Sequence, residues 1–157
     1  MSEFYFNPDI TYLNHGSFGA TPKSVLEKQF EWQRKMEEQP VHFMERVLPE
    51  ALHEAKCVAA RFLDCDPNDL FFVRNATTGI NTILDNLQLK PGEEILVTNH
   101  RYEAVGQTVK SFAKRWGAAV KEAHIDFPAP SREEMTESIL DAVSAKTRIV
   151  LVDQISS

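Results

Sequence analysis

From Leu70 to the end of the chain, short apolar runs alternate with longer amphipathic runs, and this alternation constrains the fold more than any other feature. Short apolar runs between turn-forming residues are typical of buried strands, whereas runs with a period of 3.6 residues are typical of helices. The pattern predicts strands at Leu70–Val73, Ile95–Thr98, Ala118–Ile125 and Arg148–Asp153, with helices between them that end at about Leu87, Trp116 and Val143. Because strands and helices alternate with short links, we predict an α/β fold with a mostly parallel sheet.

Turn and capping signals separate these elements. Pro91 and Gly92 predict a turn before the second strand. Glu103 opens a helical pattern that continues to Trp116. Ser131 is followed three residues later by Glu134, which is the sequence of a capping box, so we expect the last helix to begin there.

The chain before Leu70 lacks this alternation of strand and helix patterns. Residues 1–21 are rich in turn-forming residues, and a helical pattern follows them. Pro22 suits a first helical position with Thr21 as its N-cap. The pattern is interrupted at Pro40, and a second helix is predicted at about Leu48–Leu63. We therefore predict three parts, namely an N-terminal segment at 1–21, a helical region at 22–63 and a partial α/β domain at 64–157.

Composition restricts the class of protein. The chain has 17 Lys and Arg against 23 Asp and Glu, and the formal net charge of −6 argues against a nucleic-acid partner. No apolar run is long enough to span a bilayer, and the first residues have neither the basic nor the apolar region of a secretory signal. Cys57 and Cys65 do not form a disulfide pattern, so we expect reduced thiols in a cytoplasmic protein. His53 and Cys57 lack further ligands at suitable spacing, so no metal site is predicted.

A short polar junction, Asn75–Gly79, joins the first predicted strand to its helix. The first turn of a helix offers unpaired backbone N–H groups at the positive end of the helix dipole. Small residues such as Ala76 allow an anion to approach these groups, and the hydroxyls of Thr77 and Thr78 add donors. The junction therefore either binds a phosphate or only caps an ordinary helix. It contains no Gly-rich loop with a Lys, which argues against a nucleotide P-loop.

Two further segments have a polar pattern that suits a ligand. In "LVTNHRYEAV", His100 and Tyr102 follow a strand at the edge where ligands bind in open α/β sheets, and either ring can stack on a planar group or lie on the surface. In "YLNHGSFGATP", the residues Asn14, His15 and Gly16 can present N–H groups to a carboxylate or form an ordinary loop.

The sequence ends at "IVLVDQISS", where a buried strand is expected to pass into a loop. Because ligands bind at the carboxyl ends of such strands, we interpret the chain as a fragment whose site is incomplete. We further expect such a fragment to expose apolar surface and to associate.

Taken together and in this order, "YLNHGSFGATP", "NATTGIN", "PGEEILVTNHRYEAV" and "IVLVDQISS" closely resemble segments of the class V aminotransferase family. Members of this family are pyridoxal-phosphate enzymes of fold type I. Within the family, the chain is most similar to the isopenicillin N epimerase-like branch, which is related to cysteine desulfurases and C–S lyases. The resemblance implies part of the large domain of such an enzyme, a small amino-acid substrate and a homodimer of the intact protein. From the charge and the short apolar runs, we expect neither nucleic acid nor a membrane as a partner.

The resemblance also implies roles for individual residues. Most of them are cofactor contacts: Ala76, Thr77 and Thr78 would donate to the cofactor phosphate, Tyr102 would stack on the pyridine ring with His100 as second choice, and Ser156 or Ser157 would lie near the 3′-oxygen. Asn14, His15 and Gly16 match the segment that faces the substrate carboxylate.

The resemblance implies no catalytic residue in this chain. In the family, the Asp that holds the pyridinium nitrogen and the Schiff-base Lys lie beyond the segment that matches "IVLVDQISS", and no lysine here lies in a matching motif. The intact protein is expected to act at the α-carbon of an amino acid as an epimerase, a C–S lyase or an aminotransferase, and this segment alone is expected to be inactive. The alternative is a non-catalytic phosphate- or cofactor-binding module, or a structural fragment without a ligand.

Overall fold

Three parallel strands form the only sheet in the described residues, which in this computed structural model are 3–128, 131–153 and 155. The strands are β1 (Glu94–Thr98), β2 (Ala119–Ala123) and β3 (Thr147–Leu151), in the spatial order β2-β1-β3. Both pairs are parallel. The predicted α/β fold with a parallel sheet is confirmed, and the central strand β1 is buried from Ile95 to Thr98.

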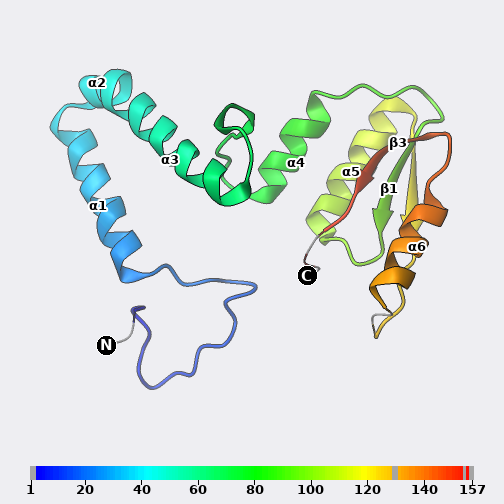
Figure 1. Cartoon of the computed structure of the whole chain (residues 1–157), viewed down its shortest axis with the longest axis horizontal. Helices are drawn as coiled ribbons and strands as arrows, with labels where there is room; N and C mark the ends of the chain where they lie inside the picture. Colours follow the sequence, from blue (N-terminus) through cyan, green and yellow to red (C-terminus); the bar gives the residue numbers. More distant parts are fainter. Residues whose placement is uncertain (1–2, 129–130, 154, 156–157) are drawn as a thin grey trace. The chain divides into compact units, whose positions relative to one another are not determined.

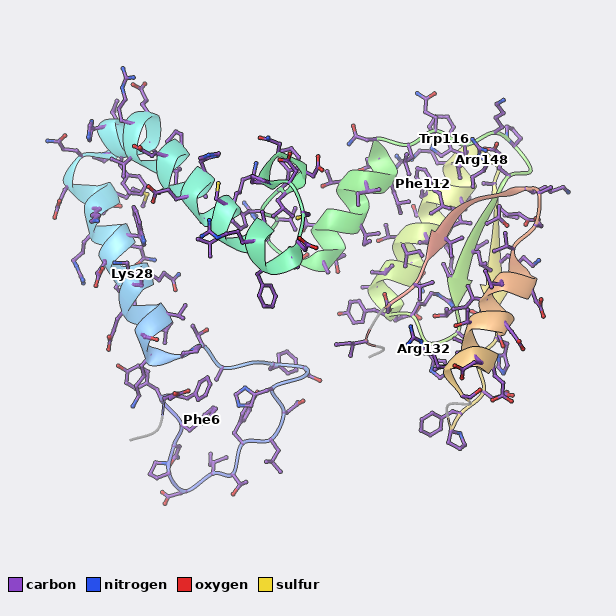
Figure 2. The ribbon with its side chains drawn as sticks, viewed as in Figure 1. Phe6, Lys28, Phe112, Trp116, Arg132 and Arg148 are labelled. Atoms are coloured by element: carbon purple, nitrogen blue, oxygen red, sulfur yellow. The ribbon has the colours of Figure 1, made fainter. Side chains whose placement is uncertain are left out.

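Three helices accompany this sheet: α4 (Ala76–Asp85), α5 (Glu103–Trp116) and α6 (Arg132–Ala142). Successive side chains of a strand point to opposite faces, and Ile95 and Val97 point into a core that also contains Leu84 of α4. The α5 helix contributes Val105, Val109, Phe112 and Ala113 to the same core. Figure 2 labels Phe112 and Trp116, which lie on α5 and pack in or against this cluster. One face of the sheet is therefore covered by α4 and α5.

The helices α4 and α5 run in the same direction (Figure 1). The side chain of Asn81 lies 3.4 Å from the hydroxyl of Thr108, and further along both helices Arg115 pairs with Asp85 at 2.9 Å. The N-termini of the two helices consequently lie at the same end of the structure. Because α5 begins just after β1 ends, this is the carboxyl end of the sheet, where open α/β folds bind their ligands.

The chain divides into two compact units, Met1–Phe72 and Val73–Ser157, and the sheet lies in the second. The first unit is helical and contains α1 (Lys23–Glu38), α2 (Pro40–His42), a π-helical turn η1 (Phe43–Val47), α3 (Leu48–Leu63) and a 3-10 turn η2 (Pro67–Asp69). Phe43 is buried and meets the ring of Trp32 edge-on at 6.1 Å. The α1 helix buries no residue fully, so much apolar surface of this unit is exposed.

Two local predictions were wrong. Leu70–Val73 is not a strand, and Phe71 is 82% exposed, because no strand of the described sheet pairs with this apolar run. Thr21 is not the N-cap of α1, which is Pro22. The backbone N–H of Lys23 instead donates to the carbonyl of Glu3 at 2.9 Å, a contact with a distant part of the chain. The predicted domain boundaries stay predictions.

Candidate functional site

The N-terminus of α4 is capped by Asn75. Its backbone is extended, with φ of −163° and ψ of 168°, and its Oδ1 accepts the N–H of Thr78 at 2.8 Å. The carbonyl of Asn75 accepts the N–H of Gly79, which starts the helical ladder. An Asn at this position stabilises a helix by about 1 kcal/mol relative to Ala. The interpretation of this junction as a helix cap is therefore correct for Asn75.

The cap leaves two backbone donors available. Within the ranges that the structure describes, the N–H groups of Ala76 and Thr77 have no acceptor. Ala76 is exposed and Thr77 is partly buried. Both N–H groups lie at the positive end of the α4 dipole, which favours an anion. The junction thus caps the helix and still offers two N–H groups to a phosphate, so the two interpretations are compatible.

The loop between β1 and α5 is bonded to the end of β2. Asn99 forms a reciprocal pair with Ile125, in which its Nδ2 donates to the carbonyl at 3.0 Å and its Oδ1 accepts the N–H at 2.8 Å. The Nε2 of His100 lies 2.9 Å from the same carbonyl. The half-buried ring of His100 is consequently engaged with the backbone that follows β2.

Arg101 belongs to the same loop, and its largely buried side chain bonds to β1 and β2. Its Nη1 donates to the carbonyl of Thr98 at 2.9 Å and forms an ion pair with Glu122 of β2. The Arg101 side chain is only 13% exposed. It lies against Gly106 of α5, where an added Cβ would stand 2.7 Å from the Nε of Arg101. The guanidinium therefore occupies space that a side chain at position 106 would take.

Tyr102 is the N-cap of α5 and is 50% exposed. Its side chain makes no capping bond, and its backbone N–H donates to Oδ2 of Asp153 at 2.8 Å. Asp153 lies just after β3, the neighbour of β1 on the opposite side from β2. The loop 99–102 is thus tied to both neighbouring strands.

Two of the predicted residues lie at the same end of the sheet in the second unit. Thr77 lies in the first turn of α4, and Tyr102 is the N-cap of α5. Because the two helices are parallel, both residues lie at the carboxyl end of the sheet. Ser156 and Ser157 lie outside the described residues. Asn14, His15 and Gly16 belong to the first unit.

In the N-terminal segment, His15 is surrounded by aromatic rings. Its ring lies 5.1 to 5.5 Å from the rings of Phe4, Phe6 and Tyr12, and Phe6 is labelled in Figure 2. The single O–H donor of Tyr12 is shared between the carbonyls of Asn14 and Phe18. These contacts shape the Asn14–Phe18 loop, and Asn14, His15 and Gly16 remain exposed on it.

Sequence reasoning missed Asp153 and the pair of Arg101 with Glu122. The available signal was positional, because Asp153 is the last residue of a predicted strand and Arg101 directly precedes Tyr102. Among the residues that the structure describes, no three His, Cys, Asp or Glu side chains converge as metal ligands do. No helix in the described ranges has the length and apolarity that a membrane span requires.

Comparisons with known proteins identify the family. The profile described as "Aminotransferase class-V" matches residues 11–157. The chain is 28% identical to a probable chloroplastic L-cysteine desulfhydrase of Arabidopsis thaliana, over 99% of this chain and 36% of that protein. It is 25% identical to the isopenicillin N epimerase of Streptomyces clavuligerus, over 96% of this chain and 38% of that protein.

A solved structure has the same fold. A mutant of C-DES with glycine covalently linked to its PLP cofactor superposes with a TM-score of 0.79 at 23% identity, over 92% of this chain and 38% of that one. The chain therefore spans a little over a third of the length of these relatives.

Proposed function

This chain belongs to the class V aminotransferase family, and from this premise we propose that it supplies the phosphate-binding and ring-stacking residues of a pyridoxal-phosphate enzyme. The family and its structural relatives support pyridoxal 5′-phosphate as the cofactor. The observation that carries the proposal is the N-terminus of α4. Two backbone N–H groups there lack an acceptor within the described ranges, at the same end of the sheet as the exposed Tyr102.

The donor chemistry of this end suits a phosphate ester. The N–H groups of Ala76 and Thr77 would donate to phosphate oxygens, and the hydroxyls of Thr77 and Thr78 would add donors. The N–H of Thr78 already donates to Asn75, so Thr78 would contribute through its hydroxyl. The small side chain of Ala76 leaves the approach to these groups open. The residues present therefore fit the phosphate of the cofactor.

The remaining cofactor and substrate contacts follow from the family resemblance. Tyr102 would lie against the pyridine ring, and one of Ser156 and Ser157 would lie near the 3′-oxygen. His100 is the second choice for the ring, although its Nε2 already lies beside the carbonyl of Ile125. Asn14, His15 and Gly16 would bind the substrate carboxylate.

The proposed reaction is at the α-carbon of an amino acid. When bound, the cofactor withdraws electrons from that carbon and so makes its proton removable. The similarity to desulfhydrases and to epimerases supports a C–S lyase or an epimerase, with transamination as a third activity of the family. No residue of this chain matches the family's catalytic lysine, so we propose that this segment is inactive by itself. The intact enzyme would be a cytoplasmic homodimer.

The test is a Thr77→Val variant of the full-length protein. Loss of a charge-assisted hydrogen bond to the phosphate should weaken cofactor binding by about 1–3 kcal/mol, measured by absorbance titration with pyridoxal phosphate. Thr82→Val is the matched control, because Thr82 is an exposed threonine on the same helix whose hydroxyl bonds only within it. Unchanged cofactor affinity in the Thr77 variant would contradict the proposal and would indicate that the junction only caps the helix.

A further inference from the structure

The bond between Tyr102 and Asp153 joins residues that are 51 positions apart. The backbone N–H of Tyr102 donates to Oδ2 of Asp153 at 2.8 Å, and Asp153 is half-buried after the end of β3. Because the side chain of Tyr102 does not cap α5, the carboxylate of Asp153 is the acceptor that a neighbouring strand supplies at this helix start. A carboxylate is favoured there by the positive end of the helix dipole.

We propose that Asp153 is a positioning residue, which fixes the backbone of Tyr102 and thereby directs its ring toward the cofactor. This inference rests on the proposed role of Tyr102 as the residue that stacks on the cofactor ring. Asp153 touches neither the ring nor any reacting atom in this account. It acts only through the backbone N–H of Tyr102.

The geometry of the loop explains why a backbone bond can direct the ring. Tyr102 has φ of −62° and ψ of 129°, and these two angles set the direction of its Cα–Cβ bond. The residue before it, Arg101, is anchored to β2 through Glu122 and to β1 through the carbonyl of Thr98. Asp153 adds the third anchor, from β3. The Tyr102 backbone is thus held from both neighbours of β1.

The ring itself has little to hold it in the described part of the chain. Tyr102 is 50% exposed, and no described aromatic ring or cation packs on it. The direction of the ring therefore depends on its backbone more than on side-chain packing. Removing the carboxylate should release the N–H and broaden the range of directions that the ring adopts.

The experiment is a double-mutant cycle in the full-length protein loaded with pyridoxal phosphate. The variants are Asp153→Ala, Asp153→Asn, Tyr102→Ala and the Asp153→Ala, Tyr102→Ala pair, with Asp141→Ala as a matched control at an exposed position of α6. The readouts are the dissociation constant of the cofactor and the visible circular dichroism of the bound cofactor, which reports its ring environment. Thermal unfolding is recorded for every variant.

Tyr102→Ala should weaken cofactor binding roughly 3- to 10-fold, the usual range for an aromatic stacking contact. Asp153→Ala should weaken it by a similar factor and reduce the cofactor's circular dichroism band. Asp153→Asn keeps an oxygen acceptor and should stay within about 2-fold of the parent protein. In the Tyr102→Ala background, Asp153→Ala should add less than about 2-fold, because the ring that it directs is already gone.

Equal effects of Asp153→Ala with and without the Tyr102 ring would overturn the inference, because they would show a purely structural role. If Tyr102→Ala weakens binding and Asp153→Ala does not, the inference fails while the proposed function stands. If Tyr102→Ala has no effect, the proposed stacking role fails and the inference fails with it. If Asp153→Ala does not fold, Asp153→Glu replaces it in the cycle, because it keeps the charge and displaces the carboxylate by one methylene, and the same outcomes apply.

Discussion

Replacing Gly106 with Ala should destabilise the protein, although the same change normally strengthens a helix. Gly106 is buried within α5, and the three nearest atoms to an added Cβ all belong to Arg101. The Nε of Arg101 would stand 2.7 Å from that Cβ, which is too close for the two atoms to coexist. The Arg101 side chain must therefore move away from its present position.

The size of the effect follows from what Arg101 would lose. Its bond to the carbonyl of Thr98 is a hydrogen bond from a charged donor, which contributes about 1.5–3 kcal/mol. Its pair with Glu122, a side chain that is 47% exposed, adds only about 0–1 kcal/mol. Ala gains about 1 kcal/mol over Gly from its helix propensity. We expect Gly106→Ala to lower the free energy of unfolding by about 0.5–3 kcal/mol, the two losses less the gain in helix propensity.

Urea denaturation of the apo protein at a fixed protein concentration measures this difference. Gly79→Ala in α4 is the matched control, because a Cβ there would make an ordinary contact of 3.5 Å with Val73. It should stabilise the protein by up to about 1 kcal/mol. Gly106→Ala should likewise stabilise the protein in an Arg101→Ala background, where the obstacle is absent. A Gly106→Ala variant that is more stable than its parent while Arg101 is present would refute the argument.

Three further predictions concern the helices and the state of the chain. The capping box at α6 lowers the pKa of Glu134, first through the side-chain hydrogen bond from Ser131 and then through its backbone N–H. Its stabilising effect should be complete above the ordinary pKa of glutamate and be lost as the pH falls through the lowered pKa, so Glu134→Gln should flatten this part of the acid unfolding curve. Asp85→Asn should cost less than about 1 kcal/mol and nothing measurable in 1 M salt, because both partners of the Asp85–Arg115 pair are 60% exposed. The 157-residue chain by itself should sediment as an associated species at low concentration because residues such as Phe62, at 89% exposure, present apolar surface to water, and a stable monomer would contradict this.

Local signals predicted most of the elements. The bounds of α3 and α5 agree with the periodicity of the sequence, and α5 is followed by its C-cap Gly117, whose φ of 65° suits a residue without a Cβ. Ser131 and Glu134 form the capping box that their spacing predicts. In each case the decisive interactions lie within a few residues of one another, so a short window of sequence contains them.

The wrong predictions depended on distant partners. Phe71 and its neighbours have the composition of a strand, but a strand also requires another strand to pair with, and the described sheet has β2 and β3 at its edges. The start of α1 involves the carbonyl of Glu3, which no local rule associates with Lys23. The strand propensity of a segment is a property of its own residues, whereas the segment forms a strand only where another strand pairs with it.

The same distinction between local signals and distant partners applies to the residues of the candidate site. The resemblance singled out Thr77 and Tyr102 because both lie in recognisable motifs. Asp153 was missed because its contact with Tyr102 requires β3 to lie beside β1, in the order β2-β1-β3. The order of strands along the chain does not predict that arrangement. The same holds for Arg101 and Glu122, which meet only because β2 lies on the other side of β1.

The most direct test of the central claim is a crystal structure of the full-length protein with pyridoxal phosphate bound. The account predicts phosphate oxygens within hydrogen-bonding distance of the N–H groups of Ala76 and Thr77, with the ring of Tyr102 parallel to the pyridine ring and in contact with it. A phosphate bound away from the N-terminus of α4, with Tyr102 turned from the cofactor, would contradict it.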